Sequence, residues 1–430
     1  MKIFWYFLYN LLVIPVFWIG GHIAGLFNRK AHAGLAGRRR ILPDVEQFMS
    51  GRNRSQKCIL FHCASMGEYE QIRPVLREIS QREPDIVRIV SFFSSSGYDN
   101  VVDNPDVDLK TYLPLDTPGK VRHFLNCLRP DAVVISKHDV WPNLVWALAS
   151  RQIPSLLVNG TMPIDSVRAK PVLRNFFRSS FVDLSFVAPA SEQDMKGFRK
   201  ILPACPNMEV LGDTRYDQVL IRAGESKDMT TILENLPPDK KTFVAGSTWP
   251  SDEEHLLPAI IRLLHKMPEF FAIIIPHELN EAHIEDLIDS FESSAIGATL
   301  YSKLESGGNL LDYRVLIINR IGILANLYGY GQVAYVGGSF GPGVHNVMEP
   351  AAYGIPVLFG PRILNSPEAR ALQECGAGFL VEDSQDVYRQ LERLFADEPA
   401  RQEAGRSAKA FIDENSGATE RITGKILSYV

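Results

Sequence analysis

Short apolar runs alternate with amphipathic stretches along the chain from Cys58 onward. The runs have the length of buried strands, whereas stretches such as Tyr69–Gln81 and Leu144–Ser150 are typical of helices. This alternation indicates βαβ units and predicts a parallel sheet. The expected strands of this first series are Cys58–Cys63, Val87–Phe93, Ala132–Ser136, Ser155–Asn159 and Ser185–Ala188.

The alternation restarts after residue 240, which predicts a second α/β domain. A polar stretch with two prolines, Ala223–Lys240, is the expected linker. We therefore expect an N-terminal segment 1–30, a first Rossmann-like domain 31–225 and a second Rossmann-like domain 226–430. Ligands of such sheets bind beyond the carboxyl ends of the strands. The expected strands of the second series are Thr242–Gly246, Phe271–Ile275, Arg314–Ile318, Val333–Val336 and Pro356–Phe359.

The N-terminal segment has no charged residue from Ile3 to Phe27, and this length is sufficient to cross a hydrocarbon core of about 30 Å. A basic cluster follows it, which places the rest of the chain on the cytoplasmic side of the membrane. Three other interpretations are a cleaved signal peptide, a buried core helix, and a helix in the membrane interface, since Asn10, Pro15 and His22 weaken a span. The choice between a spanning and an interfacial helix stays open. The basic cluster consists of Arg29, Lys30, Arg38, Arg39 and Arg40.

Composition excludes several other classes of protein. The net charge of −5 argues against a general nucleic-acid binder, so we expect no nucleic-acid partner. The five cysteines have no paired CxxC spacing, and no cluster of Asp or His has the spacing of metal ligands. We therefore expect neither a bound metal nor another cofactor.

Two turns after expected strands carry candidate chemistry. Ser65-Met66-Gly67-Glu68 follows the first strand, so Gly67 allows a close backbone approach and Glu68 opens a helix at a cleft edge. The alternative is a helix cap with an acidic first turn. Gly246-Ser247-Thr248-Trp249 is a weaker turn of the phosphate-binding type.

The stretch Val333–Pro350 is more specific, because a buried strand runs into a glycine-rich turn at Gly337–Ser339. Such a turn exposes N–H groups, and with a helix that begins near Val344 it would cradle phosphate oxygens. Glu349 would then lie one turn into that helix, where a carboxylate suits the hydroxyls of a nucleotide ribose. A purely structural strand-to-helix turn is the alternative.

Taken together, these stretches resemble the family of Kdo (3-deoxy-D-manno-octulosonic acid) transferases, and the resemblance covers nearly the whole chain. Besides the N-terminal anchor, the matching motifs occur in the order of the family. They are Ser65-Met66-Gly67-Glu68, Tyr112-Leu113-Pro114-Leu115-Asp116, Asp139-Val140-Trp141-Pro142-Asn143, Gly212-Asp213-Thr214-Arg215-Tyr216-Asp217, Ala245-Gly246-Ser247-Thr248, Pro276-His277-Glu278, Gly337-Gly338-Ser339 and His345-Asn346-Val347-Met348-Glu349-Pro350.

The resemblance implies an α/β protein of the GT-B glycosyltransferase fold, with two Rossmann-like domains facing across a cleft. It implies an inverting enzyme at the cell inner membrane that transfers Kdo from the donor CMP-Kdo to a lipid A precursor in lipopolysaccharide biosynthesis, with its catalytic domains on the cytoplasmic side. Glu68 matches the general base of the family. The donor contacts that carry over, together with the glycine-rich turns, are Gly246, Ser247, Pro276, His277, Ile321, Gly322, Ile323, Gly338, Ser339, Asn346, Val347, Met348 and Glu349.

The chain departs from the family pattern at several charged positions, which puts the charge balance at the donor in doubt. Lys137-His138-Asp139 stands where many members have Glu-Thr-Glu, and Pro276-His277-Glu278 where many have Pro-Arg-His. Ile321-Gly322-Ile323 replaces the usual Met-Gly-Glu, and Arg215 replaces a lysine. Lys137 and Arg215 are cationic candidates for the sugar carboxylate or for transition-state charge; either is alternatively a structural ion-pair partner.

The lipid acceptor and the inner-membrane lipids require a surface that suits an anionic interface. Residues 165–183 carry four basic residues with interleaved phenylalanines, which is the composition of such a surface. A solvated basic helix face is the alternative. Two rival functions also stay open: another GT-B enzyme that uses a UDP- or ADP-sugar, and a membrane-tethered nucleotide-binding protein without catalysis. The basic residues are Arg168, Lys170, Arg174 and Arg178.

Overall fold

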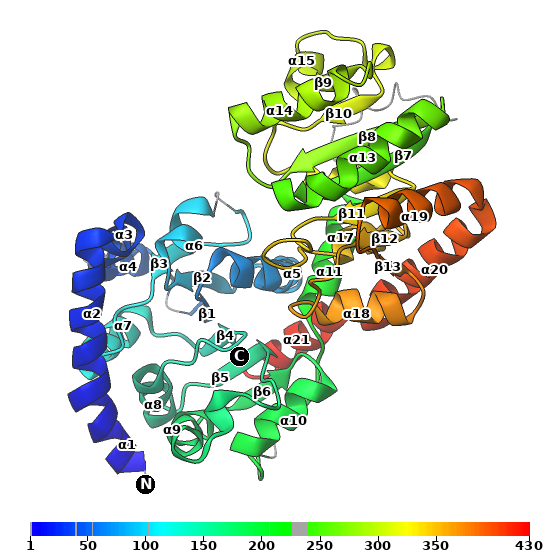
Figure 1. Ribbon diagram of the computed structural model, residues 1–430. Coiled ribbons are helices and arrows are strands. Elements are labelled where there is room, and N and C mark those ends of the chain that lie inside the picture. The colour runs from blue at the N-terminus through cyan, green and yellow to red at the C-terminus, as the bar shows by residue number, and fades with distance from the viewer. Residues whose placement is uncertain (1, 39–40, 54, 102–103, 206, 226–239) are drawn as a thin grey trace. The chain divides into compact units, whose positions relative to one another are not determined.

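The computed structural model describes the chain except residues 1, 39–40, 54, 102–103, 206 and 226–239 (Figure 1). The chain divides into two compact units, Met1–Gln218 with Ser416–Val430, and Val219–Asn415. This division differs from the expected domains, since the last fifteen residues belong to the first unit and not to the second. Most of the expected linker, Ala223–Lys240, lies outside the described residues.

In its described part the first unit contains a six-stranded parallel sheet with the order β3-β2-β1-β4-β5-β6. The five expected strands are confirmed to within one residue at most ends, and their side chains are almost all buried. The short edge strand β3 was not expected. The strands are β1 (Cys58–Cys63), β2 (Val87–Phe92), β3 (Leu109–Tyr112), β4 (Ala132–Ser136), β5 (Ser155–Gly160) and β6 (Phe186–Pro189).

Amphipathic helices cover this sheet because their apolar residues recur on one face. In α5 the buried Ile72, Val75, Leu76 and Ile79 follow the helical spacing and join the same core as β1 and β2. The body helices of this unit are α3 (Arg29–Gly37), α4 (Ile41–Ser50), α5 (Met66–Arg82), α6 (Ser95–Asn100), α7 (Pro118–Leu128), α8 (Pro142–Ser150), η2 (Val167–Ala169), α9 (Pro171–Phe181), α10 (Glu192–Ile201), α11 (Thr214–Gly224, which continues into the second unit) and α21 (Ala418–Leu427).

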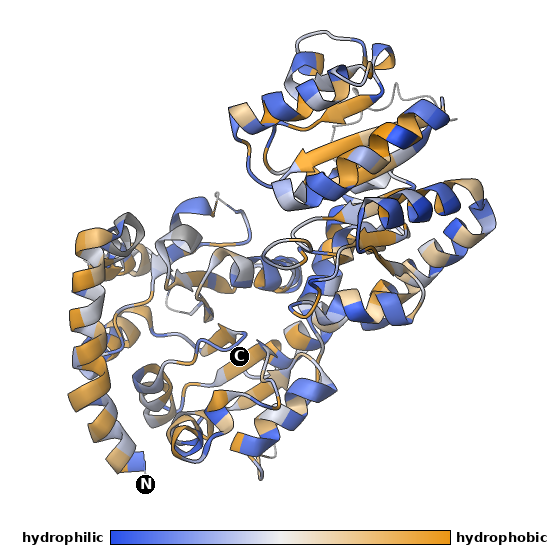
Figure 2. Ribbon diagram, in the orientation of Figure 1, coloured by the Kyte–Doolittle hydropathy of each residue, from blue (hydrophilic) through white to orange (hydrophobic). Residues whose placement is uncertain are grey.

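The N-terminal segment Lys2–Phe27 is a continuous helical stretch, long and apolar enough to cross a membrane, a property that a signal sequence shares. It comprises α1 (Lys2–Leu8), the π-helical turn η1 (Tyr9–Val13) and α2 (Ile14–Phe27), and it is mostly apolar (Figure 2). Its apolar residues are largely exposed. One face nevertheless contacts the body. Tyr9 donates a hydrogen bond of 2.9 Å to buried Asp116, and Asn10 exchanges hydrogen bonds with Asn143.

In its described part the second unit contains a seven-stranded parallel sheet with the order β13-β12-β11-β7-β8-β10-β9. All five expected strands of this series are confirmed, and β9 and β13 were not expected. The strands are β7 (Lys241–Thr248), β8 (Phe270–Pro276), β9 (Ala298–Leu300), β10 (Val315–Ile317), β11 (Val333–Val336), β12 (Val357–Phe359) and β13 (Gly378–Leu380).

The helices of the second unit surround an apolar core formed largely by β7, β8, β11 and the long helices α13 and α19. They are α13 (Pro250–Lys266), α14 (Glu281–Glu292), α15 (Tyr301–Glu305), η3 (Leu310–Asp312), α16 (Leu324–Leu327), η4 (Tyr328–Tyr330), α17 (Met348–Ala352), α18 (Pro367–Glu374), α19 (Ser384–Ala396) and α20 (Glu398–Asn415).

Candidate functional site

Glu68 lies in the first turn of α5, directly beyond the carboxyl end of β1. Its side chain is only 6% exposed, and its Oε2 accepts a hydrogen bond of 2.6 Å from the backbone N–H of Ala64. Burial raises the pKa of Glu68 above its ordinary value, and the hydrogen bond from Ala64 offsets part of this effect. Glu68 therefore caps the first turn of its own helix, and it is also a buried carboxyl group with increased basicity. The helix cap and the functional carboxylate, the two interpretations from the sequence, are thus compatible.

A histidine on β1 and an aspartate that follows the neighbouring strand β4 are hydrogen-bonded to each other next to Glu68. His62 on β1 is fully buried, and its Nε2 lies 2.9 Å from Oδ2 of Asp139, which follows β4. Its Nδ1 lies 3.0 Å from Oγ of Ser91, and Trp141 Nε1 donates to the same oxygen of Asp139 at 3.0 Å. Burial alone would raise the pKa of Asp139, but the hydrogen bonds from His62 and Trp141 lower it below its ordinary value.

Positive charge surrounds this edge of the first sheet. Lys137 adopts φ = +66° after β4, and its ammonium has no hydrogen bond or ion pair within the described residues. The charge of Lys137 stabilises ionised Glu68. The pKa of His138 is lowered mainly by burial, and the charges of Arg168 and Lys137 lower it further. Lys137 is thus available as a cationic group close to Glu68.

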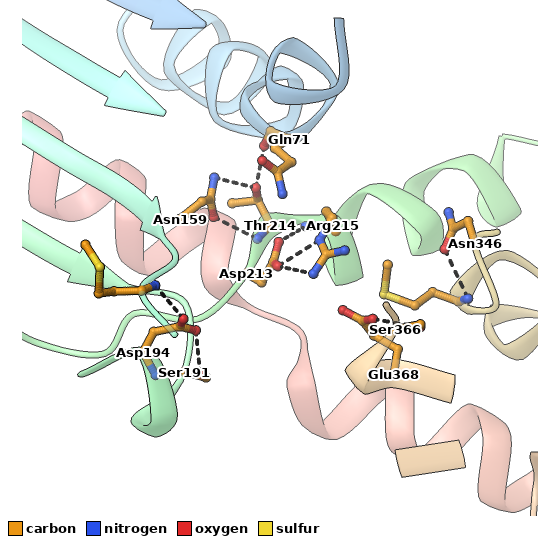
Figure 3. A network of polar contacts seen from close by, with 12 residues as sticks. Gln71, Asn159, Ser191, Asp194, Asp213, Thr214, Arg215, Asn346, Ser366 and Glu368 are labelled. Atoms are coloured by element: carbon orange, nitrogen blue, oxygen red, sulfur yellow. Dashed lines mark hydrogen bonds and ion pairs between the residues drawn. The ribbon is translucent and has the colours of Figure 1, made fainter. Parts of the chain in front are cut away.

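Arg215 has a different environment, shown in Figure 3. Its Nε and Nη2 lie 2.8 and 2.7 Å from Oδ2 of Asp213, and its backbone N–H donates to Oδ1. The neighbouring Thr214 is buried and donates to the carbonyl oxygen of Gln71, while its Oγ1 accepts 2.9 Å from the amide of Asn159. The structural ion pair that was the alternative for Arg215 is therefore present.

In the second unit, three rings stack beyond the carboxyl ends of the adjacent strands β11, β7 and β8. The His277 ring stacks on both Trp249 and His345, whose ring centroids lie 4.7 and 4.5 Å from its own. Trp249 Nε1 donates to His345 Nε2 at 2.8 Å, which leaves the imidazole proton on Nδ1. Burial lowers the pKa of His345, and the charge of His277 adds to this effect, so His345 is neutral at neutral pH.

The glycine-rich turn differs from the expectation because most of its N–H groups already have acceptors. Buried Asp252 on α13 accepts hydrogen bonds from Gly338 N (2.7 Å) and Phe340 N (3.1 Å), and Gly337 N donates to the carbonyl of Gly246. Gly341 N and Gly343 N also donate within the turn. An acidic side chain thus occupies the position expected for a phosphate.

The glycines of the turn are instead needed for packing. A Cβ at Gly338, whose φ is +85°, would lie 2.3 Å from the carbonyl of Gly343, and one at Gly246 would lie 2.1 Å from the hydroxyl of Tyr328. Ser339 is fully buried, and its Oγ accepts from Gly360 N at 2.7 Å. Ser339, Gly338 and Gly246 therefore hold the turn together, whereas Ser247 is partly exposed with φ = +53°.

The helix after this turn begins at Met348 and not near Val344, and it has only five residues. Asn346 Oδ1 accepts 3.1 Å from Met348 N, so the Asn346 side chain ends the loop and starts the helix. Glu349 consequently lies in the first turn of α17, 3.2 Å from Asn346 Nδ2 and 3.5 Å from Arg222 Nη1. The side chains of Val347 and Met348 are buried, which limits their ligand contacts to the backbone.

The remaining expected donor residues lie at the end of β8 and directly before α16. Pro276 is the buried last residue of β8, and His277 after it is exposed. Ile321 is 83% exposed, which is unusual for an apolar side chain, and Gly322 has φ = +89° before α16. Ile323 is partly exposed and precedes the first residue of that helix.

Several residues at these edges were missed as site residues from the sequence. Trp249 and His345 were noted only as parts of motifs, and Asp252, His62 and Asp139 were not assigned a role. His62, Asp139 and Trp249 share a positional signal, since each lies near the carboxyl end of a buried strand, whereas Asp252 and His345 lie further along the chain.

One group of potential metal ligands occurs among the described residues, on α4 and α7. Ligand atoms of Glu46, His123 and Cys127 lie within 4.8 Å of one another. They hydrogen-bond among themselves, with Glu46 Oε1 3.2 Å from His123 Nε2 and 3.3 Å from Cys127 Sγ. The group is largely exposed and is separate from the Glu68 edge.

The chain is similar to known transferases over most of its length. A family model of 3-deoxy-D-manno-octulosonic-acid transferases (kdotransferases) matches residues 38–218. Transferases of this name from Haemophilus influenzae and Chlamydia pneumoniae are each 25% identical, with 86% of this chain and 87% or 85% of theirs covered. A probable mitochondrial one from Arabidopsis thaliana is 28% identical over 70% of this chain and 68% of its own.

Solved structures show the same fold at low identity. A UDP-GlcNAc 2-epimerase from Neisseria meningitidis, bound to UDP-GlcNAc, has a TM-score of 0.63 and 15% identity, with 86% of this chain and all of that chain covered. Another UDP-N-acetylglucosamine 2-epimerase has a TM-score of 0.57 and 12% identity, with coverages of 87% and 97%. With its two Rossmann-like sheets and these relatives over most of its length, the chain belongs to the Kdo transferase family of glycosyltransferases with the GT-B fold.

Proposed function

We propose that the protein transfers Kdo from CMP-Kdo to a hydroxyl of a lipid A precursor in lipopolysaccharide biosynthesis, with inversion and with Glu68 as the general base. The observation that carries this proposal is the environment of Glu68: a buried carboxyl group with a raised pKa at the carboxyl edge of the first sheet, in a chain of this family. The names of the relatives support the transfer of Kdo.

The reaction requires a proton acceptor for the attacking hydroxyl and a partner for the charge of the departing cytidine monophosphate. Glu68 takes the proton, and the Ala64 N–H keeps its second oxygen in place. His62 and Asp139 stiffen the adjacent strand ends, and Lys137 offers a positive charge to the Kdo carboxylate. Arg215, which Asp213 holds in an ion pair, adds a second positive charge for the Kdo carboxylate.

In the second unit, the stacked rings and Glu349 are the donor groups that we propose. His277 supplies an exposed ring and His345 an Nδ1–H, so the pair can contact a base or a phosphate. Glu349 accepts hydrogen bonds from the two ribose hydroxyls, which replace its contacts with Asn346 and Arg222. Since the amides of the glycine turn are engaged, phosphate recognition falls to side chains more than to that turn.

We also propose that the N-terminal helix lies in the interface of the inner membrane, with the two units on the cytoplasmic side. Trp5 and Tyr9 contact Phe176 of α9, and Phe17 contacts Phe93 and Trp141. A helix that packs against the body at Trp5, Tyr9 and Phe17 cannot be surrounded by lipid, as a spanning helix would be. Its outer face is apolar, as interfacial helices require.

The test is Kdo transfer, followed as cytidine monophosphate release from CMP-Kdo with a lipid A precursor. Glu68→Gln keeps the shape but removes the base, so turnover should fall by roughly 10²-fold or more while CMP affinity stays nearly unchanged. In the wild type the acid limb of kcat should lie above the ordinary glutamate range, because burial raises the pKa of Glu68.

Glu70→Gln is the matched control. Glu70 is on the same helix, but its carboxylate pairs with Arg73 at 3.1 Å and accepts from Gln218, so the substitution should have a much smaller effect on turnover. Near-normal turnover of folded Glu68→Gln at saturating donor would place the base elsewhere. Absence of CMP release in the wild type would instead favour a different sugar nucleotide or a binding protein without catalysis.

A further inference from the structure

An apolar cavity of about 300 Å³ lies in the first unit where the N-terminal helix meets the body. One wall comes from α2 and α3, and the other from the segment after β2 and from Leu115. This volume is at the lower end for sites that hold a small organic group. The residues used in the argument are Phe17, Trp18, Gly21, Arg38, Phe93 and Leu115.

Two of the residues from the N-terminal helix that line the cavity are also exposed. Phe17 and Trp18 contribute to its lining, yet they remain 42% and 47% exposed, and they continue the exposed apolar face of Lys2–Phe27. A hydrocarbon chain in a membrane next to this helix would therefore enter the cavity without crossing a polar surface.

The opposite wall is connected to Glu68 by two hydrogen bonds, one between backbone groups and one to the Glu68 side chain. Ser94, which lines the cavity after β2, donates from its N–H to the carbonyl of Ala64 at 2.9 Å. The N–H of Ala64 in turn donates to Oε2 of Glu68 at 2.6 Å. Since β1 and β2 are adjacent parallel strands, the cavity and Glu68 share one edge of the sheet.

A fixed positive charge lies in the wall of the cavity. The Arg38 guanidinium lies 4.5 Å from the centre of the Phe93 ring and donates to the carbonyl oxygens of Phe93 (2.5 Å) and Leu113 (3.1 Å). Burial lowers its pKa to about 10, so it stays charged at neutral pH. An apolar cavity with a cation in its wall is complementary to a lipid that combines hydrocarbon chains with an anionic headgroup.

We propose that this cavity binds one acyl chain of the phosphorylated lipid acceptor, with Arg38 facing the phosphate end and the sugar hydroxyl brought toward Glu68. The inference rests on the proposed function, since it names a subsite for the acceptor of that reaction. It explains why the N-terminal helix and the Glu68 edge belong to one unit. The acyl chain enters along the helix, and the headgroup attached to it then reaches Glu68.

Gly21 and its neighbour Gly20 provide a matched pair of variants. A Cβ at either glycine meets no atom within 4 Å, so leucine is tolerated at both, but only Gly21 lines the cavity. Gly21→Leu should raise KM for the acylated acceptor by about tenfold or more, with kcat/KM for a deacylated phosphorylated disaccharide unchanged. Gly20→Leu should leave both values unchanged. Equal KM values for the acylated acceptor in the two variants, or equal losses on both acceptors, would overturn the subsite.

A binding experiment separates this subsite from the reaction itself. An acceptor lipid with a diazirine in one acyl chain is photolysed with the full-length protein in vesicles, without CMP-Kdo. Crosslinked peptides should contain Phe17–Gly21 or Phe93–Ser95, and Gly21→Leu should suppress them. Crosslinks spread along Lys2–Phe27 and unaffected by Gly21→Leu would overturn the subsite. If the wild type turns over neither acceptor, the proposed reaction fails while the crosslinks still decide the subsite.

Discussion

The carboxylate of Glu349 lies between two donors, Arg222 and Asn346, in the first turn of α17. Glu349→Ala should weaken CMP binding by about 2–4 kcal/mol, the loss expected for a pair of hydrogen bonds to a charged group. Calorimetry would measure this change, and wild-type CMP affinity should be well above UMP affinity. Glu374→Ala, at the exposed end of α18, is the control and should have no effect. Equal CMP affinity in wild type and Glu349→Ala would remove Glu349 from the site.

Individual residues also show where sequence reasoning stops. The position of Glu68 after β1 was predicted correctly, because strand periodicity and a Gly-Glu turn determine it. The role of the glycine turn was not, because nothing in Val333–Pro350 reveals that a carboxylate 86 to 88 residues earlier, Asp252, accepts its N–H groups. Ser339 likewise reads as a ligand residue, but its hydroxyl is enclosed by Tyr335 and Gly360.

Among the elements, η2 and α9 combine exposed charge with exposed apolar side chains. Lys170, Arg174 and Arg178 are exposed, whereas Arg168 is partly buried near Asp139 and Phe177. Val167, Val172 and Leu173 are exposed on the same segment. α9 also contacts α1 through Trp5 and Phe176, so this segment and the N-terminal helix form one apolar and basic region.

This region should bind anionic membranes. Replacing Lys170, Arg174 and Arg178 by Gln in the full-length protein should lower affinity for anionic vesicles by about 10²-fold, because each basic residue near the surface contributes about 1 kcal/mol. Binding to neutral vesicles should not change, and cosedimentation measures both. The control with the same charge change replaces Arg370, Arg406 and Lys409 by Gln on α18 and α20. If both triple variants bind anionic vesicles equally, the basic helix face is only solvated.

The strands that sequence analysis found and those that it missed differ in burial and length. The confirmed strands are mostly buried apolar runs, and all of them except β6 lie inside a sheet. The three missed strands are β3, β9 and β13, each of three or four residues and each at or next to a sheet edge. Such short strands have too few residues for a periodic pattern, and their pairing depends on the neighbouring strand. The same limit applies to α17, whose start depends on one side chain, Asn346.

At the scale of the whole molecule, the chain passes from the first unit to the second and returns. Sequence alternation detected the first passage but not the return, because α20 and α21 both read as ordinary amphipathic helices. The return is specified by contacts distant in sequence. Ala418, Ile422 and Ile426 of α21 belong to the same core cluster as Ile72 and Leu76 of α5.

Asp217 is the polar attachment of this returning segment. Its carboxylate accepts hydrogen bonds from Gly417 N (2.5 Å), Thr419 N (2.7 Å) and Thr419 Oγ1 (2.8 Å), all within the first unit. Asp217→Asn removes the charge and at least one acceptor, so it should destabilise the first unit by about 2–4 kcal/mol. Asp413→Asn, at an exposed position on α20 in the second unit, is the control.

Hydrogen exchange by mass spectrometry is the suitable measurement, because two units need not unfold in one step. In Asp217→Asn, exchange should accelerate in α21, in α5 and in the β1 strand that α5 covers, while β7 and β8 keep their wild-type protection. Asp413→Asn should leave the first unit unchanged, since its carboxylate pairs with Lys409 within α20. Acceleration in β7 and β8 equal to that in β1 would show that the two units unfold together, and that Ser416–Val430 stabilises the whole chain and not the first unit alone.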